Sequence, residues 1–527
     1  MPPTQIVDAE RFSKVMFLRS VVLRSTADHF KTLGAENFQL TRPLLGVLLQ
    51  ESSQLEELLD AYGARINQKW STLRLHVATI KNFSTAGYDL LHLCTTIQNY
   101  DFQGDHPFFR SATEDAVELV TAYIYCALMG FLRDTEAFTE WPPPESLHGY
   151  DFSEELPPGR LPKDRKASSD TSAQQLITQL ATDFLNQTED AAFLQTADLS
   201  IGPHWKGLNF DLLTEATFLI LEGKFHTMQS LYDTYISYSE MEGNDTSLRA
   251  LRGHISVVLH LLKVATVFIH FYERHLKIQS EKLFCHTQCV LSGNWYMEVF
   301  THYLCHYAYE FLASARGLCQ KMLKNYAVIE TCEVPVPPYA GFHVRPSALI
   351  SKIAEHYNSK VVMILGGVEY DCMVSMNLWR ANEYLNQLKR DYVATQVLKH
   401  GELLRDLQRQ LDAGETTKVE AARVIVRMLA KEGIVKVLKY PMPLEPIIES
   451  SSAPTLVELL QTICANLMGR RQITVPFPVK AQFRGDKRVL QDIQLLAKNT
   501  YCETEEGVNL PIPPALAYLN TARKGRF

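Results

Sequence analysis

A helical repeat of apolar residues, sustained over many turns, is the strongest constraint that this sequence places on its fold. Between Leu45 and Ile80 the apolar side chains step mostly by three and four residues, which is the spacing of one face of an α-helix. Similar stretches cover 112–132, 212–242, 247–277 and 294–326. We therefore expect the first 325 residues to be almost entirely helical, as in antiparallel bundles or long helical hairpins.

A proline-rich and polar stretch interrupts this pattern. Three prolines follow Trp141, and the run 163–171 is polar and charged. Such composition is typical of linkers, because it offers little apolar surface to bury. We expect residues 141–171 to be a linker between a helical domain of residues 1–140 and a second one of residues 172–327.

The pattern changes again at Val328. Prolines make residues 333–338 extended, since proline excludes helix and biases the preceding residue to β. A short amphipathic helix is expected over 346–357. The apolar run 360–365 predicts a strand, and Gly366-Gly367 predicts a tight hairpin turn into a second strand, 368–372.

Residues 380–470 return to a helical pattern, in which Thr417 and Glu420 have the spacing of a capping box. Residues 473–483 are expected to be extended, and 486–498 form an amphipathic helix. The proline-rich tail from Tyr501 is expected to be peripheral.

The motif that carries chemistry is Gly341-Phe-His-Val-Arg-Pro346, which lies between a predicted strand and a predicted helix. Proline is tolerated in a first helical turn, which puts His343 at or next to the N-cap. A helix N-terminus offers unpaired N–H groups and the positive end of the helix dipole, so it favours anions. A phosphoryl group on the imidazole would meet these donors and the guanidinium of Arg345, whose rigid fork binds phosphate oxygens.

This motif resembles the active-site signature of HPr phosphocarriers, a Gly-hydrophobic-His-x-Arg-Pro sequence. The resemblance extends to the following hairpin and to a second short helix at 373–379. It resumes at 479–485 and 486–498, which look like the family's last strand and last helix. The resemblance therefore implies an HPr-like domain that is split by a helical insertion.

Three positions depart from the family pattern. Ala340 stands where a small polar residue is common, and the family's regulatory serine falls on Val374, with Ser375 one residue later. Met376 would belong to the hydrophobic patch that the family presents to partner enzymes, but the neighbouring Ser375 weakens this patch. These departures leave open whether serine phosphorylation or phosphoryl transfer is retained.

The resemblance implies that His343 accepts a phosphoryl group from a phosphoenolpyruvate-dependent protein kinase, with Arg345 as phosphate stabiliser. The phosphoryl group would pass to a protein partner, or signal to one, among the phosphotransferase-system proteins. A carrier embedded in so long a chain fits a regulatory protein better than a stand-alone enzyme. Two alternatives stay open, namely a non-catalytic interaction scaffold with a degenerate HPr-like domain and a metal-dependent enzyme in the helical bundle.

The second alternative depends on a cluster of cysteines and histidines. Cys285, Cys289, His302 and His306 formally obey the spacing of a zinc finger. Residues 296–312, however, have the pattern of a long apolar helix, which explains the cluster as part of a buried helical face. We expect no metal and no cofactor.

Composition points to a cytoplasmic protein. The net charge of −7 gives no reason to expect nucleic acid as a partner. No segment reaches the roughly 18 uninterrupted apolar residues of a membrane span, so no membrane insertion is expected. The ten cysteines are scattered without a dense framework, and no secretory leader is apparent, which favours a reducing compartment.

The sequence thus predicts a mainly α protein with an α+β domain, in which N-terminal helical bundles precede an HPr-like open-faced β-sandwich. Its oligomeric state stays undetermined. The expected segments are, in chain order, a helical domain (1–140), a linker (141–171), a helical domain (172–327), the first part of the HPr-like domain (328–379), a helical insertion (380–470), the second part of the HPr-like domain (471–502) and a tail (503–527).

Overall fold

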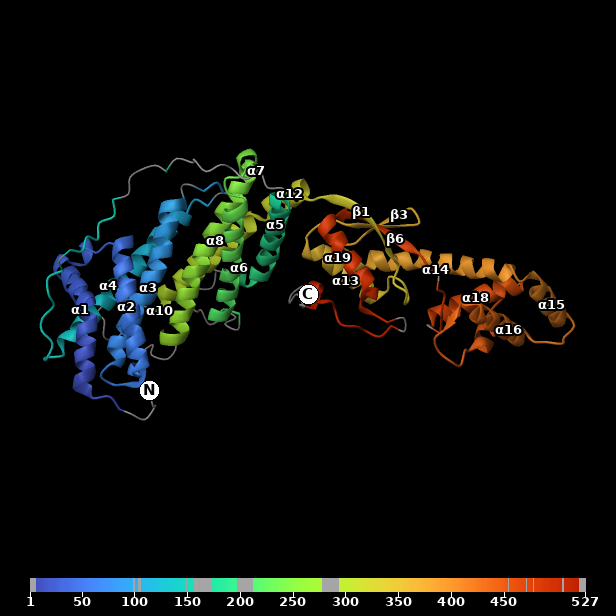
Figure 1. Ribbon diagram of the computed structural model, residues 1–527, viewed down its shortest axis with the longest axis horizontal. Coiled ribbons are helices and arrows are strands. Elements are labelled where there is room, and N and C mark those ends of the chain that lie inside the picture. Colours follow the sequence, from blue (N-terminus) through green and yellow to red (C-terminus); the bar gives the residue numbers. More distant parts are fainter. Residues whose placement is uncertain are drawn as a thin grey trace. The chain divides into compact units, whose positions relative to one another are not determined.

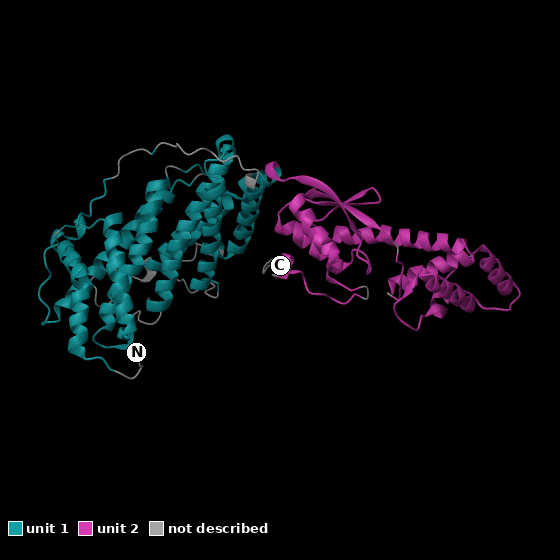
Figure 2. Ribbon diagram, viewed as in Figure 1, with its two compact units in different colours: residues 1–324 teal, residues 325–527 magenta. Residues whose placement is uncertain are grey.

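The chain forms two compact units, residues 1–324 and 325–527 (Figure 2). The protein is described from a computed structural model. The residues that it describes are 6–97, 100–102, 106–147, 149–155, 161, 172–196, 212–276, 293–453, 455–470, 472–476, 478–504 and 507–520. The chain is mostly helical and carries a small antiparallel sheet of four strands, as the sequence predicted for a mainly α protein with an α+β part.

The helices up to residue 326 occupy most of the stretches with a helical pattern (Figure 1). They are α1 (Ala9–Leu33), α2 (Arg42–Ala61), α3 (Ser71–Thr96), α4 (Phe109–Glu136), α5 (Ser172–Asp190), α6 (Glu215–Tyr235), α7 (Glu240–Asn244), α8 (Thr246–Phe271), α10 (Gly293–Glu298), α11 (His306–Ser314) and α12 (Arg316–Tyr326). A π-helical segment, Val299–Cys305, joins α10 to α11.

The helical repeat from Leu45 to Ile80 is divided between two helices, α2 and α3. The chain leaves α2 after Ala61, and Gly63 takes a left-handed conformation with φ of 72°. Ile66, which fitted the apolar face, is 93% exposed. Glycine adopts this conformation at little cost and often ends a helix. The spacing of apolar residues is helical on both sides of Gly63, so this spacing alone does not reveal the break.

The two helical blocks that the sequence assigned to separate domains lie in one compact unit. The aromatic ring of Phe83 on α3 stacks on Tyr123 of α4, with 4.7 Å between the ring centres. The same ring packs edge-on against Phe268 of α8 at 5.5 Å. Because α3 is covered by helices from both blocks, the two blocks share one core.

The start of the expected linker packs against the first helices. The indole N–H of Trp141 donates to Ser13 Oγ (2.9 Å), and Arg24 Nη2 donates to the carbonyl of Pro142 (2.9 Å). Thr41 Oγ1 donates to the carbonyl of Phe152 (2.6 Å). Residues 141–147 and 149–155 therefore belong to the helical unit, and all but residue 161 of the remaining linker lies outside the described residues.

Two helices are long and apolar enough to cross a membrane by length and composition alone. They are Phe109–Glu136 and Thr246–His275, whose most apolar windows are 61% and 78% buried inside the unit. The core helix of a soluble protein passes the same test of length and composition.

The second unit contains the four-stranded sheet (Figure 1). Its strands are β1 (Ile329–Pro335), β2 (Val362–Leu365), β3 (Val368–Asp371) and β6 (Lys480–Asp486), in the spatial order β1-β6-β2-β3 and all antiparallel. Strand β6, which comes last of the four in the sequence, therefore lies between β1 and β2. Residues from both sides of the insertion are hydrogen-bonded neighbours.

One face of this sheet forms a core with three helices, α13 (Val344–His356), α14 (Ser375–Leu398) and α19 (Lys487–Lys498). Met363 and Phe483 of the strands are fully buried, together with Ile353 of α13 and Ile493 of α19. Along β6 buried and exposed residues alternate, as expected when an antiparallel sheet buries a single face.

The expected short helix 373–379 is in fact the start of the 24-residue helix α14. Ala381 and Leu385 of α14 belong to the core under the sheet, whereas Val393 and Val397 belong to a second core. Helical periodicity continues without interruption from one core to the other, so the boundary expected between residues 379 and 380 falls inside α14.

This second core belongs to a lobe of short elements. They are α15 (Gly401–Asp412), α16 (Lys418–Lys431), β4 (Lys436–Val437), α17 (Leu444–Glu449), α18 (Leu456–Gly469) and β5 (Ile473–Thr474). The predicted capping box of Thr417 and Glu420 is present at the start of α16. The two-residue strands β4 and β5 pair with each other, so the insertion is not purely helical.

The expectation of a peripheral tail is wrong. Leu516 and Leu519 are buried in the core under the sheet, at 0% and 3% exposure. Tyr518 donates from its hydroxyl to Asp492 on α19 (2.6 Å) and stacks on His356 of α13. The prolines of the tail suggested a peripheral segment, but its leucines pack into the core that α13 and α19 form with the sheet.

Candidate functional site

His343 lies on the loop that leads from β1 into α13, and it is the N-cap of that helix. Two left-handed residues precede it, Ala340 with φ of 51° and Gly341 with φ of 62°. The side chain of His343 caps no backbone N–H of the helix. The predicted position of the histidine at the helix start is therefore confirmed.

The loop before His343 is held from both sides. The backbone N–H of Phe342 donates to Asn382 Oδ1 on α14 (2.7 Å), and Ser347 Oγ donates to the carbonyl of Phe342 (2.8 Å). The ring of Phe342 is fully buried. At Gly341 a Cβ atom would collide with Asn382 Oδ1, so this position requires glycine both for its backbone conformation and for space.

Arg345, in the first turn of α13, lies beside the histidine. Its Nη2 donates to the carbonyl of Leu510 in the tail (3.2 Å). Its Nε–H is buried and finds no hydrogen-bond acceptor among the described residues. A buried donor without an acceptor is costly, and here it lies at a helix N-terminus, where the dipole also favours an anion.

The structure adds a third charged residue that the sequence did not reveal. Oε2 of Glu503 lies 2.8 Å from His343 Nε2, and Oε1 of Glu503 lies 3.8 Å from Arg345 Nε. The side chain of Glu503 is only 4% exposed. No local pattern could predict this pair, because 160 residues separate its members.

A left-handed turn brings Glu503 to the histidine. Thr500, Tyr501 and Cys502 have φ values of 50°, 57° and 59°. Left-handed backbone costs on the order of 1–2 kcal/mol for each non-glycine residue. The turn is fixed by the hydroxyl of Tyr501, which donates to the carbonyl of Pro335 (2.7 Å), and by the N–H of Leu510, which donates to the carbonyl of Cys502 (2.7 Å).

The imidazole of His343 is largely covered. Its side chain is 14% exposed, with the ring of Tyr339 perpendicular to it at 5.5 Å. Three apolar side chains of this part of the unit are exposed, namely Val344 (77%) beside the histidine and Met376 (55%) and Trp379 (52%) in the first turns of α14. Val374 is the N-cap of α14, and the exposed Ser375 is its first residue.

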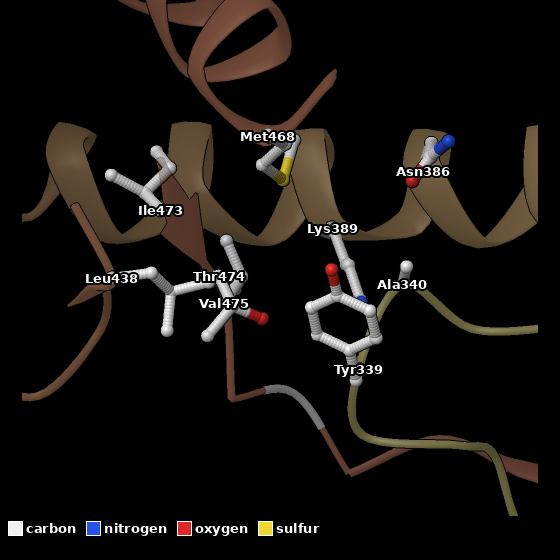
Figure 3. A pocket seen from close by; sticks show the side chains of 9 residues that line it. All are labelled: Tyr339, Ala340, Asn386, Lys389, Leu438, Met468, Ile473, Thr474 and Val475. Carbon is white, nitrogen blue, oxygen red and sulfur yellow. The ribbon is translucent and has the colours of Figure 1, made fainter. Parts of the chain in front are cut away.

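A small cavity adjoins the loop of the motif (Figure 3). It has a volume of about 40 Å³ and lies between Tyr339 and Ala340 on one side and residues of the helical lobe on the other, among them Lys389, Met468 and Val475. Burial lowers the pKa of Lys389. The cavity holds a few water molecules at most and is too small for a metabolite.

The cysteine–histidine cluster of the helical unit lies only partly within the described residues. Cys285 and Cys289 fall outside them, whereas His302 lies in the π-helical segment and His306 begins α11. In the described part of the chain, no group of three or more His, Cys, Asp or Glu side chains could hold a metal ion.

The described cysteines are mostly free thiols. Cys94, Cys305, Cys319, Cys332, Cys372, Cys464 and Cys502 form no disulfide, whereas Cys126 is disulfide-bonded. Burial raises the pKa of Cys305 and Cys319. These two thiols are therefore unreactive core residues.

Comparison of the whole chain with protein-family models, with curated proteins and with solved structures gives no match. We therefore infer a function from the residues of the site itself.

Proposed function

We propose that the sheet-containing part of the second unit is an HPr-like phosphocarrier domain, split by the helical lobe. In this proposal His343 accepts a phosphoryl group from a phosphoenolpyruvate-dependent protein kinase. The phosphoryl group is then passed to a protein partner, or its presence is signalled to one.

The observation that carries the proposal is that the neighbour of His343, Arg345, has a buried hydrogen-bond donor without an acceptor among the described residues. Nε2 of the ring is bonded to Glu503, and no described residue bonds to Nδ1. The buried Nε–H of Arg345 has no acceptor among the described residues. A phosphoryl oxygen would supply that acceptor, and guanidinium–phosphate bonds are among the stronger hydrogen bonds in proteins.

The order of elements also supports the proposal. A strand, a helix that starts at the histidine, a two-strand hairpin, a helix, a strand and a last helix follow one another in the order that the HPr resemblance implies. The helical lobe lies between the helix α14 and the strand β6 in this order. The three helices cover one face of the sheet, as in an open-faced β-sandwich.

The surroundings of the site favour transfer between proteins. Phosphoryl transfer depends mainly on positioning and charge stabilisation, and exposed apolar side chains commonly mark protein contacts. Val344, Met376 and Trp379 are exposed apolar side chains of this kind. With so much additional chain, we propose a regulatory or sensing protein of the cytoplasm, acting on phosphotransferase-system proteins.

One observation favours a second candidate, an interaction scaffold whose HPr-like domain no longer transfers phosphate. The imidazole is only 14% exposed and is covered by the tail. A scaffold would keep the fold and the apolar surface without the chemistry. Phosphorylation distinguishes the two candidates directly.

The test is incubation of the full-length protein with labelled phosphoenolpyruvate and the general phosphotransferase enzyme. We expect a label that is labile in acid and stable in base, that is absent from His343→Ala and that forms more slowly in Arg345→Ala. His400→Ala is the matched control, because His400 also pairs with a glutamate, Glu432 (3.0 Å), at the surface of the helical lobe. Equal labelling of wild type and His343→Ala would refute the proposal.

A further inference from the structure

Glu503 is held against His343 by a strained and well-anchored piece of backbone. The three residues before it are left-handed, and two of them, Tyr501 and Cys502, are buried in the core under the sheet. Thr500 Oγ1 donates to the carbonyl of Glu503 itself (2.6 Å). Strained backbone of this kind is concentrated at functional sites, where the surrounding structure supports it.

The carboxylate of Glu503 determines which nitrogen of His343 carries the proton. An ionised carboxylate can only accept hydrogen bonds, so at 2.8 Å from Oε2 the Nε2 atom must be the donor. In a neutral imidazole the other nitrogen, Nδ1, then holds the lone pair. No described residue bonds to Nδ1, so its lone pair is available for attack.

We propose that Glu503 is a positioning residue that directs the phosphoryl group to Nδ1 of His343 and stabilises the imidazolium formed there. The inference rests on the proposed function and deepens it. It explains why a carboxylate, which would repel a phosphoryl group at Nε2, is fixed on that side of the ring.

The step balances without loss of a proton. The lone pair of Nδ1 forms the N–P bond, while the bond between phosphorus and the donor's leaving atom breaks and its electron pair stays on the donor. The ring gains a positive charge and keeps its proton on Nε2. Glu503 faces this charge, as the aspartate of a Ser-His-Asp triad faces its imidazolium.

The guanidinium of Arg345 lies beside the same carboxylate that binds Nε2 of His343. Glu503 Oε1 lies 3.8 Å from Arg345 Nε, which is beyond hydrogen-bond distance. The carboxylate therefore lies near the guanidinium without satisfying its Nε–H. Leu510, on the same tail, accepts from Nη2 (3.2 Å) and fixes the guanidinium.

The first measurement is made without phosphorylation. Spectra of the full-length protein, labelled with ¹⁵N-histidine and assigned with His343→Ala, report the tautomer of His343. We expect the Nε2–H tautomer in the wild type and a mixture of tautomers in Glu503→Gln, whose amide can either donate or accept. Glu432→Gln is the matched control and should leave the His343 signals unchanged.

The second measurement locates the phosphoryl group. The protein is phosphorylated with phosphoramidate, a small chemical donor, and separately with phosphoenolpyruvate and the general phosphotransferase enzyme. We expect Nδ1-phosphohistidine in the wild type. In Glu503→Gln we expect at least a tenfold slower reaction and a detectable share of Nε2-phosphohistidine, whereas Glu432→Gln should react as the wild type does.

The outcomes separate the two proposals. Label from phosphoramidate alone, at Nδ1, would overturn the proposed function and leave the role of Glu503 standing. Nε2-phosphohistidine in the wild type, an Nδ1–H tautomer, or an unchanged or faster reaction in a folded Glu503→Gln would overturn the role of Glu503. No label from either donor would overturn both. The wild-type tautomer and the wild-type position of the label decide the inference even if Glu503→Gln does not fold.

Discussion

His343 Nε2 lies 2.8 Å from Oε2 of Glu503, although the two residues are 160 positions apart in the chain. One residue belongs to the loop before α13, and the other follows the left-handed turn after α19. Strands β2, β3 and β6 and the helical lobe lie between them in sequence. The geometry at the histidine therefore depends on correct docking of the C-terminal segment.

The loop before the histidine should tolerate no side chain at Gly341. We expect Gly341→Ala to destabilise the second unit and to slow labelling of His343, because the added Cβ would displace Asn382 from the N–H of Phe342. Gly367→Ala is the control, since Gly367 is also left-handed but a Cβ there would meet nothing within 4 Å. Overpacking typically costs about 1–3 kcal/mol, so denaturant unfolding should show a loss of this order for Gly341→Ala beyond that for Gly367→Ala. Equal losses would contradict the packing argument.

The tail should behave as part of the core. Truncation of a buried leucine to alanine costs about 2–5 kcal/mol, and we expect a loss in this range for Leu516→Ala, whose side chain is fully buried. Hydrogen exchange should also rise over the tail and over α13. Leu398→Ala, at a site that is 60% exposed, should change neither property. If Leu516→Ala were as stable as Leu398→Ala, the tail would be peripheral.

The sequence predicted most of the elements around the site but not their mutual arrangement. The motif from Gly341 to Pro346 gave the N-cap position of His343, and the Gly366-Gly367 pair gave the hairpin, because both depend on neighbouring residues. Glu503 could not be found in this way, since its contact depends on tertiary packing. Its local signals, a proline-rich and polar tail, pointed away from the core.

The same limit applies to helix boundaries. Apolar spacing predicted α2 and the start of α14 as helical, yet it did not locate the break at Gly63 after α2 and it ended the other helix too early, at residue 379. A period of 3.6 residues reports which face is buried, and it does not report against which core. Successive turns of α14 contribute side chains to two different cores. The period of its apolar residues does not change where one core gives way to the other.

Acid should destabilise the helical unit through its buried histidines. Burial lowers the pKa of His254 to about 4, while Nδ1 of its ring bonds to the carbonyl of Phe311 (2.9 Å). Because the folded pKa lies below the unfolded value of ~6.5, the unfolded state binds more protons between these values. The contribution to stability is complete above pH ~6.5 and is lost as the pH falls through the folded pKa, with a loss on the order of 2 kcal/mol by pH 5.

The variant His254→Asn isolates this effect, because its amide can still donate to Phe311 while it cannot titrate. We expect the midpoint temperature of thermal unfolding to fall more steeply between pH 7 and pH 5 in the wild type than in His254→Asn. His92 and His275, whose pKa values burial lowers to about 4 and about 3, should account for part of the slope that remains. Parallel pH profiles for the two proteins would rule out His254 as a contributor.

The helical lobe should be removable if the cut respects α14. Asn386 and Val475 line the same cavity, so a short Gly/Ser linker in place of residues 390–473 can join the two sides. This variant should retain a folded domain by circular dichroism and a cooperative unfolding transition. Replacing residues 381–468 instead removes Leu385 from the core and Asn382 from the motif loop, and that variant should be markedly less stable. Equal stability of the two variants would show that the sheet does not depend on the first half of α14.

Peptide mapping of the phosphorylated wild-type protein shows directly whether His343 accepts the phosphoryl group. After labelling with phosphoenolpyruvate and the general phosphotransferase enzyme, the protein is digested and analysed by mass spectrometry under alkaline conditions, which preserve phosphohistidine. We expect to find the phosphoryl group on His343, in the peptide that carries this residue. A phosphoryl group on another residue, or an unmodified His343 peptide from a protein that is folded and exposed to an active donor, would contradict it.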